Sequence, residues 1–108
     1  MKKYIILTAV SFALATVAGF AGDIDAKAVW NKSCKKCHAE DGNGQTALGK
    51  KLKIKDYTDA ASLKEFSDED LFNMTKDGVP KTKMPGFAKK LSDPEIKALV
   101  GYMRSMAK

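Results

Sequence analysis

The stretch CKKCH, residues 34–38, contains both cysteines and the only histidine of the 108-residue chain. Two thiols and an imidazole this close together can form a redox-active dithiol, bind a metal ion or anchor a cofactor. Each of these uses requires different surroundings, so the rest of the sequence decides among them.

Residues 1–21 have the layout of a secretory signal peptide. Two lysines precede an uncharged apolar run over residues 4–18, and small residues follow, Ala21 among them. A retained membrane anchor is the alternative, since the uncharged stretch up to Gly22 approaches the ~20 residues that span a bilayer. Cleavage would leave one domain over residues 22–108, in the periplasm or otherwise exported.

Lysine carries most of the positive charge. The formal net charge is +6, and Arg104 is the only arginine. Proteins that bind nucleic acids commonly use arginine side chains for bidentate contacts and aromatic side chains for base stacking, so this composition argues against a nucleic-acid partner. A domain of this size buries a modest core and often needs a disulfide, a metal or a cofactor to hold its fold.

Apolar periodicity and capping residues predict three helices, and no segment alternates as a half-buried strand does. The first helix covers about residues 25–36. The second begins after Ser67 with three acidic residues and ends at Gly78. The third begins after Ser92, which forms a capping box with the glutamate three residues later, and continues to the end of the chain. A weaker helical turn is expected over residues 60–65.

The segment over residues 39–58 is rich in glycine and lysine, and we predict a long loop there. Three helices with two long loops make a poor core by themselves. The sequence therefore indicates that a large apolar group completes the fold.

Three ordinary uses of the cysteines fit poorly. A thioredoxin-like dithiol follows a strand in a βαβ unit, whereas a helical face precedes Cys34, and export would oxidise an unprotected dithiol. A disulfide between Cys34 and Cys37 would close a very small loop and add little stability. A zinc site needs four ligands, and adding His38 to the cysteines gives only three.

The spacing Cys-x-x-Cys-His is the signature of covalent haem attachment. One helical turn places the thiols of Cys34 and Cys37 on the same side, where each can form a thioether with one vinyl group of a haem. The next residue, His38, can then bind the iron through its imidazole. The haem would also supply the missing apolar group of the core.

The sixth ligand of the iron is predicted to be Met84. A second histidine is excluded by count. Met103 and Met106 lie on the third predicted helix and are expected to pack in the core. Met74 lies within the second helix and is the less favoured candidate. Met84 lies between two prolines in a loop that can hold a thioether at the iron and raise its reduction potential.

These features together resemble class I monohaem c-type cytochromes over essentially all of residues 22–108. The shared pattern is an aromatic residue before the motif (Trp30), the motif itself, glycines after the histidine, a Met-Pro loop and Leu-x-x-Tyr in the last helix (Leu99 to Tyr102). The resemblance implies an all-α cytochrome c fold. In that fold the N- and C-terminal helices cross, and a middle helix and long loops surround one covalent haem c.

One departure from the family pattern concerns the haem histidine. Many members have a proline after the glycines whose carbonyl accepts the Nδ1–H of that histidine, whereas this chain reads GKKL over residues 49–52. A backbone carbonyl near Lys50 is therefore the expected acceptor. Leu52, Ile54 and Tyr57 are expected to line the haem pocket, although Tyr57 could instead reach a propionate or serve ordinary packing.

The resemblance implies an electron carrier rather than an enzyme. With His38 and Met84 bound, the iron cycles between Fe(III) and Fe(II) and has no open position for oxygen, peroxide or substrate. One alternative is a haem enzyme or gas sensor in which Met84 dissociates, but such sites usually carry a distal His or Arg. The other is a haem subunit of a larger oxidoreductase.

Lysines are concentrated in two segments that should border the haem. We expect an acidic redox partner protein to dock on them. Lysine attracts such a partner by its charge and, unlike arginine, does not form the bidentate hydrogen bonds that would slow release. We expect no nucleic-acid partner, contact with a membrane only through an uncleaved signal segment, and a monomer. The lysines of this docking face are Lys50, Lys51, Lys53, Lys55, Lys81, Lys83, Lys89 and Lys90.

Overall fold

The computed structural model describes residues 24–108, and the expected signal peptide over residues 1–21 lies outside them. Within the described part the chain forms helices and loops and no β-strand, which confirms the all-α prediction. None of the helices in this part is long and apolar enough to cross a membrane. The elements are α2 (Ala26–Ser33), α3 (Lys35–His38), α4 (Ala47–Leu52), the 3₁₀ turn η1 (Ala60–Leu63), α5 (Asp68–Asp77) and α6 (Asp93–Arg104).

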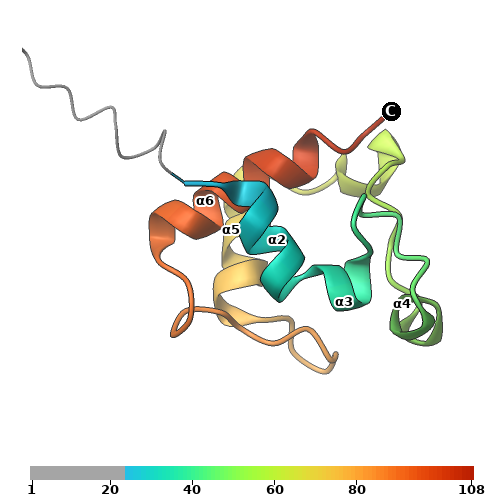
Figure 1. Ribbon diagram of the computed structural model, residues 1–108, viewed down its shortest axis with the longest axis horizontal. Coiled ribbons are helices and arrows are strands. Elements are labelled where there is room, and N and C mark those ends of the chain that lie inside the picture. The colour runs from blue at the N-terminus through green and yellow to red at the C-terminus, as the bar shows by residue number, and fades with distance from the viewer. Residues whose placement is uncertain (1–23) are drawn as a thin grey trace, which may run out of the picture.

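The core lies where α6 packs against both α2 and α5 (Figure 1). Trp30 of α2 is 1% exposed, and Leu99 of α6, in the same buried cluster, is also 1% exposed. The rings of Trp30 and Tyr102 lie 5.8 Å apart between centroids. The expected contact between the first and last helices is therefore confirmed.

The capping box predicted at Ser92 is present, and the predicted Ser67 cap also proves to be a capping box. The Ser67 side chain accepts a hydrogen bond from the backbone N–H of Asp70, whose carboxylate accepts one from the Ser67 N–H, each at 3.0 Å. Ser92 and Glu95 make the same exchange at the start of α6. Each box satisfies two N–H groups that a helix start otherwise leaves unpaired. These local signals fix where α5 and α6 begin.

The predicted loop over residues 39–58 contains a short helix, α4, so the sequence prediction was wrong there. Thr46 caps this helix by accepting a hydrogen bond from the Gly49 N–H at 2.7 Å. A Cβ atom on Gly49 would lie 2.6 Å from the carbonyl oxygen of Cys37. Glycine is a poor helix former, yet it is required here because α4 packs directly on the backbone of α3.

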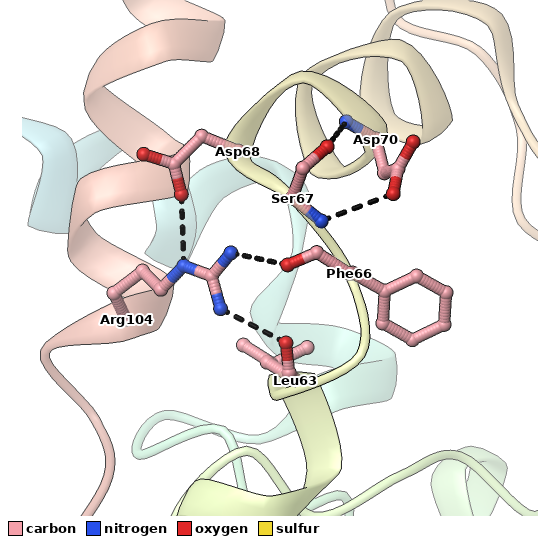
Figure 2. A network of polar contacts seen from close by, with 6 residues as sticks. All are labelled: Leu63, Phe66, Ser67, Asp68, Asp70 and Arg104. Carbon is pink, nitrogen blue, oxygen red and sulfur yellow. Dashed lines mark hydrogen bonds and ion pairs between the residues drawn. The ribbon is translucent and has the colours of Figure 1, made fainter.

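Arg104 joins the end of α6 to the segment that leads into α5 (Figure 2). Its Nε donates to the Asp68 carboxylate at 2.9 Å, Nη1 to the Leu63 carbonyl at 2.9 Å and Nη2 to the Phe66 carbonyl at 2.6 Å. Guanidinium has a rigid fork of donors that can serve several acceptors at once. The connection between η1 and α5 is thus held by a side chain from far along the sequence.

We expect Arg104→Lys to lower the free energy of unfolding by about 2–3 kcal/mol, because two partly buried carbonyls lose a partner at about 1 kcal/mol or more each. Urea unfolding followed by far-ultraviolet circular dichroism measures this loss. Lys76→Gln is the matched control, because it removes an exposed ion pair with Asp93 at 3.3 Å, worth up to about 1 kcal/mol. Equal losses for the two variants would show that Arg104 is an ordinary surface charge.

Candidate haem-binding site

The two cysteines lie at a break between helices. The sequence predicted one helix through residue 36, but α2 ends at Ser33, and Cys34, with φ −120°, begins the separate turn α3. The Cys34 N–H still donates to the Trp30 carbonyl at 2.8 Å, and the His38 N–H donates to the Cys34 carbonyl at 3.0 Å. The motif is therefore a hydrogen-bonded helical turn with a thiol near each end.

Both thiols are free and half-buried. Burial, with a smaller contribution from neighbouring Cys37, raises the pKa of Cys34 to about 11. A dithiol redox centre needs a thiol whose pKa is lowered to give a reactive thiolate. This environment therefore disfavours the redox-switch alternative.

A zinc site is also disfavoured. In the part of the chain that the structure describes, no group of three or more His, Cys, Asp or Glu side chains is placed to hold a metal ion. The ordinary zinc ligand set of four N or S atoms therefore does not form around the motif.

His38 closes α3 and is followed by a sharp change of direction. Ala39 has a φ of +76° and a ψ of 162°, a conformation that is found almost only at glycine. The indole Nε1 of Trp30 donates to the Ala39 carbonyl at 2.9 Å and fixes this turn. The aromatic residue before the motif thus holds the chain just after the histidine, a role that the sequence alone did not indicate.

The imidazole of His38 lies among aromatic rings. Its centroid is 5.2 Å from that of Tyr57 with the planes 22° apart, and 5.5 Å from that of Trp30. Burial lowers the pKa of His38, which favours the neutral imidazole that binds metals. Its Nδ1 atom is buried without a hydrogen-bond partner among the described residues.

The predicted acceptor for Nδ1 near Lys50 is therefore not found. The Lys50 carbonyl is used within the α4 region, where it accepts from the Lys53 N–H at 3.3 Å. The unpredicted helix α4 explains this difference, because it turns the carbonyls after the glycines into helix acceptors. The nearby hydroxyl of Thr46 instead donates to the Cys37 carbonyl at 2.8 Å and ties α4 to the motif.

Met84 lies in a non-helical segment between α5 and α6, as predicted, and is half-buried. Its carbonyl accepts from the Val79 N–H at 3.2 Å, and its N–H donates to the Thr82 hydroxyl at 3.1 Å. The Phe87 N–H donates to the Thr75 carbonyl of α5 at 3.0 Å. Hydrogen bonds on both sides thus hold this distal loop, residues 79–87, in one shape.

The last helix was predicted to continue to the end of the chain, but α6 ends at Arg104, so Met106 lies beyond it. Met103 is buried in the core, and Met106 packs against it. Met74 is half-buried within α5. Among the predicted pocket residues, the structure brings Tyr57 to His38, leaves Ile54 half-buried and leaves Leu52 36% exposed.

The residues present fit a covalently attached haem. Two free thiols lie about one helical turn apart, and burial lowers the pKa of the adjoining imidazole, which favours the form that binds metals. Two thiols followed directly by an imidazole are the donor set that attachment of haem c requires.

Comparison with known proteins agrees with this chemistry. Residues 23–103 match the family described as cytochrome c oxidase, cbb3-type, subunit III. The solved structure of the KustC0563 c-type cytochrome is 36% identical, with a TM-score of 0.72, and the match covers 79% of this chain and 100% of that one. The c-type cytochrome NirC is 20% identical and shares the fold, with a TM-score of 0.59 over 87% of this chain and 100% of that one.

The family match extends over most of the chain, and the KustC0563 structure is matched along its whole length. The all-α arrangement described above is thus the cytochrome c fold, built around haem c that is covalently bound. The chain belongs to the c-type cytochromes, within the family described as subunit III of cbb3-type cytochrome c oxidase.

Proposed function

We propose that this c-type cytochrome is an exported electron carrier whose single haem c alternates between Fe(III) and Fe(II). Cys34 and Cys37 would form the two thioethers, and His38 and Met84 would be the axial ligands. Haem-based electron transfer is the activity that the family assignment supports. The observation that carries the finer proposal is the half-buried imidazole of His38, its pKa lowered by burial, in one helical turn with two free thiols.

The bound haem supplies a one-electron iron couple, and the chain supplies its surroundings. His38 would present an imidazole nitrogen from a hydrogen-bonded turn, and Met84 would present a thioether from the distal loop. Because both ligands sit on segments held by backbone hydrogen bonds, their positions should change little between oxidation states. A thioether ligand favours Fe(II) and raises the potential.

An enzyme or gas sensor with a labile Met84 is the competing function. Such a site polarises its ligand with a distal His or Arg, and His38 is the only histidine of the chain. Arg104 is bound to Asp68 and to two backbone carbonyls, so its guanidinium is held at the junction of α6 with the segment before α5. These facts favour a carrier with both axial positions filled.

A haem subunit of a larger oxidoreductase is the second candidate, and the description of the matched family favours it. The two roles differ in assembly, because a carrier should behave as a monomer and a subunit should be isolated with its complex. Proposed cleavage of residues 1–21 would release the carrier into the periplasm. Size-exclusion chromatography of the protein from its native membranes and periplasm separates these cases.

Absorption spectra of the oxidised and reduced protein, with and without carbon monoxide, test the carrier directly. The protein should be produced in a host that attaches haem c. Sharp low-spin bands in both states, unchanged by carbon monoxide, are the expected result. A carbon monoxide complex in the wild-type protein would assign the site to ligand binding instead.

The proposed docking face supports transfer to an acidic partner. Its eight lysines are all exposed, and none forms a salt bridge within the described residues. Four of them lie between Val79 and Leu91, a stretch without an acidic residue. Unpaired positive charge can steer an encounter, and such electron-transfer contacts are small and weak.

We expect Lys81→Glu with Lys83→Glu to slow association with an acidic redox partner by about tenfold or more at low salt, within the range that steering spans. Stopped-flow electron transfer over a series of salt concentrations measures this, and the wild-type rate should fall as screening approaches a Debye length of about 8 Å. Lys27→Glu with Lys32→Glu, on the exposed side of α2, makes the same charge change and should matter less. If the rate of electron transfer changes neither with salt nor in either double variant, these lysines are solvated surface residues that do not guide docking.

A further inference from the structure

The packing around His38 points to a role for Tyr57 beyond lining a pocket. The two rings are stacked, with centroids 5.2 Å apart and planes 22° apart. Trp30 also contacts His38, but at a 45° tilt. Tyr57 is therefore the aromatic neighbour whose plane follows that of the imidazole.

A metal-bound histidine usually donates its second N–H to a carboxylate, a carbonyl or water, and this bond fixes the orientation of the ring. In His38 the Nδ1 atom has no such partner among the described residues. The Lys50 carbonyl, the acceptor that the sequence suggested, receives the Lys53 N–H instead. The contacts that the structure does give the imidazole are the packed rings of Tyr57 and Trp30.

Tyr57 is itself held firmly enough to do this. Its N–H donates to the Gly42 carbonyl at 2.8 Å. The Asp56 carboxylate accepts from both the N–H and the hydroxyl of Thr58, at 2.9 and 2.6 Å, and the Lys108 N–H donates to the Thr58 carbonyl at 2.9 Å. The residues on either side of Tyr57 are thus tied to each other and to the end of the chain.

Gly42 lets the two segments approach. It has a φ of +84°, and a Cβ atom there would lie 3.2 Å from the Cβ of Tyr57. The loop that contains Gly42 can approach Tyr57 closely, and this brings Tyr57, nineteen positions after His38, onto the His38 ring. The stack therefore depends on backbone geometry that a local sequence pattern does not reveal.

We propose that Tyr57 is a positioning residue for the axial histidine, whose ring sets the plane of the His38 imidazole and keeps water from that side of the haem. The inference rests on the proposed function, in which His38 binds the iron. Fe(III) carries one more positive charge than Fe(II), and water stabilises the more highly charged state. Shielding by Tyr57 should therefore raise the reduction potential, since solvent exposure is one of the factors that set it.

The test compares the haem-loaded variants Tyr57→Phe and Tyr57→Leu with Tyr102→Leu as the control. Tyr102 is also half-buried and packs against Trp30, with centroids 5.8 Å apart and planes tilted by 59°, but no ring contact joins it to His38 among the described residues. The readouts are the midpoint potential and the electron paramagnetic resonance spectrum of the ferric protein, which reports the orientation of the axial imidazole. A purely structural role would change stability without moving either readout.

We expect Tyr57→Leu to shift the midpoint potential downward and to alter or broaden the resonance spectrum. Tyr57→Phe should keep both close to wild type, because it keeps the ring. Tyr102→Leu should lower stability and leave both unchanged. An unchanged Tyr57→Leu, a Tyr57→Phe that shifts as far as Tyr57→Leu, or a Tyr102→Leu that shifts equally would each overturn the proposal.

A second measurement does not depend on a variant that folds. In the reduced low-spin wild-type protein, nuclear Overhauser contacts between the Tyr57 and His38 rings are expected, and their absence would also overturn the proposal. Failure of the proposed function looks different. If the wild-type ferric protein lacks a low-spin spectrum, the ligation by His38 and Met84 is wrong and this inference falls with it, whereas a normal wild type with unresponsive variants contradicts this inference alone.

Discussion

Replacing both Cys34 and Cys37 with alanine is expected to abolish the folded state of the protein. The haem has four linked pyrrole rings and should bury at least as much apolar area as two aromatic side chains, roughly 400 Å². That burial is worth on the order of 10 kcal/mol at ~25 cal/mol per Å². A domain of this size is stable by only about 4–13 kcal/mol in total. Without attachment, the core around Trp30 and Leu99 would lose most of its net stabilisation.

Circular dichroism and the yield of soluble protein from a haem-attaching host measure this loss. Lys35→Ala with Lys36→Ala is the matched control, because these exposed residues lie between the cysteines without taking part in attachment. The control should retain covalent haem and a cooperative unfolding transition. A double cysteine variant that folds as well as this control would mean that the haem is not part of the core.

We expect Met84→Ala to lower the reduction potential by about 0.1 V or more, within the ~0.8 V range over which axial ligands tune haem iron. The variant should also lose the weak red absorption band of Met-ligated ferric haem and should bind carbon monoxide when reduced. The cause is the removal of the thioether from a distal loop that the Val79 and Phe87 hydrogen bonds otherwise keep in place. Spectroelectrochemical titration gives both the potential and the spectrum.

Met74→Ala is the control for this experiment, because Met74 is the half-buried methionine on α5 and the less favoured ligand. It should cost packing energy of about 2 kcal/mol or more and leave the red band and the potential in place. If Met74→Ala loses the band while Met84→Ala keeps it, the sixth ligand lies on α5 and the role given to the distal loop is wrong.

Helices α5 and α6 could be predicted from the sequence because residues within one turn determine where each helix begins. Ser67 was predicted as a cap and Ser92 as part of a capping box, and in the structure each forms a capping box within four residues. The crossing of the first and last helices followed from Trp30 and Tyr102, which belong to the family pattern. The capping signals are short-range and need no knowledge of the rest of the fold, whereas the crossing joins distant residues and came from the resemblance to the family.

Three features could not be predicted because they depend on contacts between distant segments. Helix α4 contains Gly49, whose low helix propensity is outweighed by close packing on the Cys37 carbonyl. The Arg104 contacts join residues 36 to 41 positions apart. The stack of Tyr57 on His38 arises only when the glycine loop folds back. No periodicity or motif records any of these three contacts.

The assignment of residues 34–38 to haem attachment can be tested on the wild-type protein by mass spectrometry after proteolysis under denaturing conditions. The account predicts that the peptide containing Cys34 and Cys37 carries the mass of one haem that denaturant and acid do not remove. A peptide of unmodified mass, or one joined by a Cys34–Cys37 disulfide, from protein made in a haem-attaching host would contradict it.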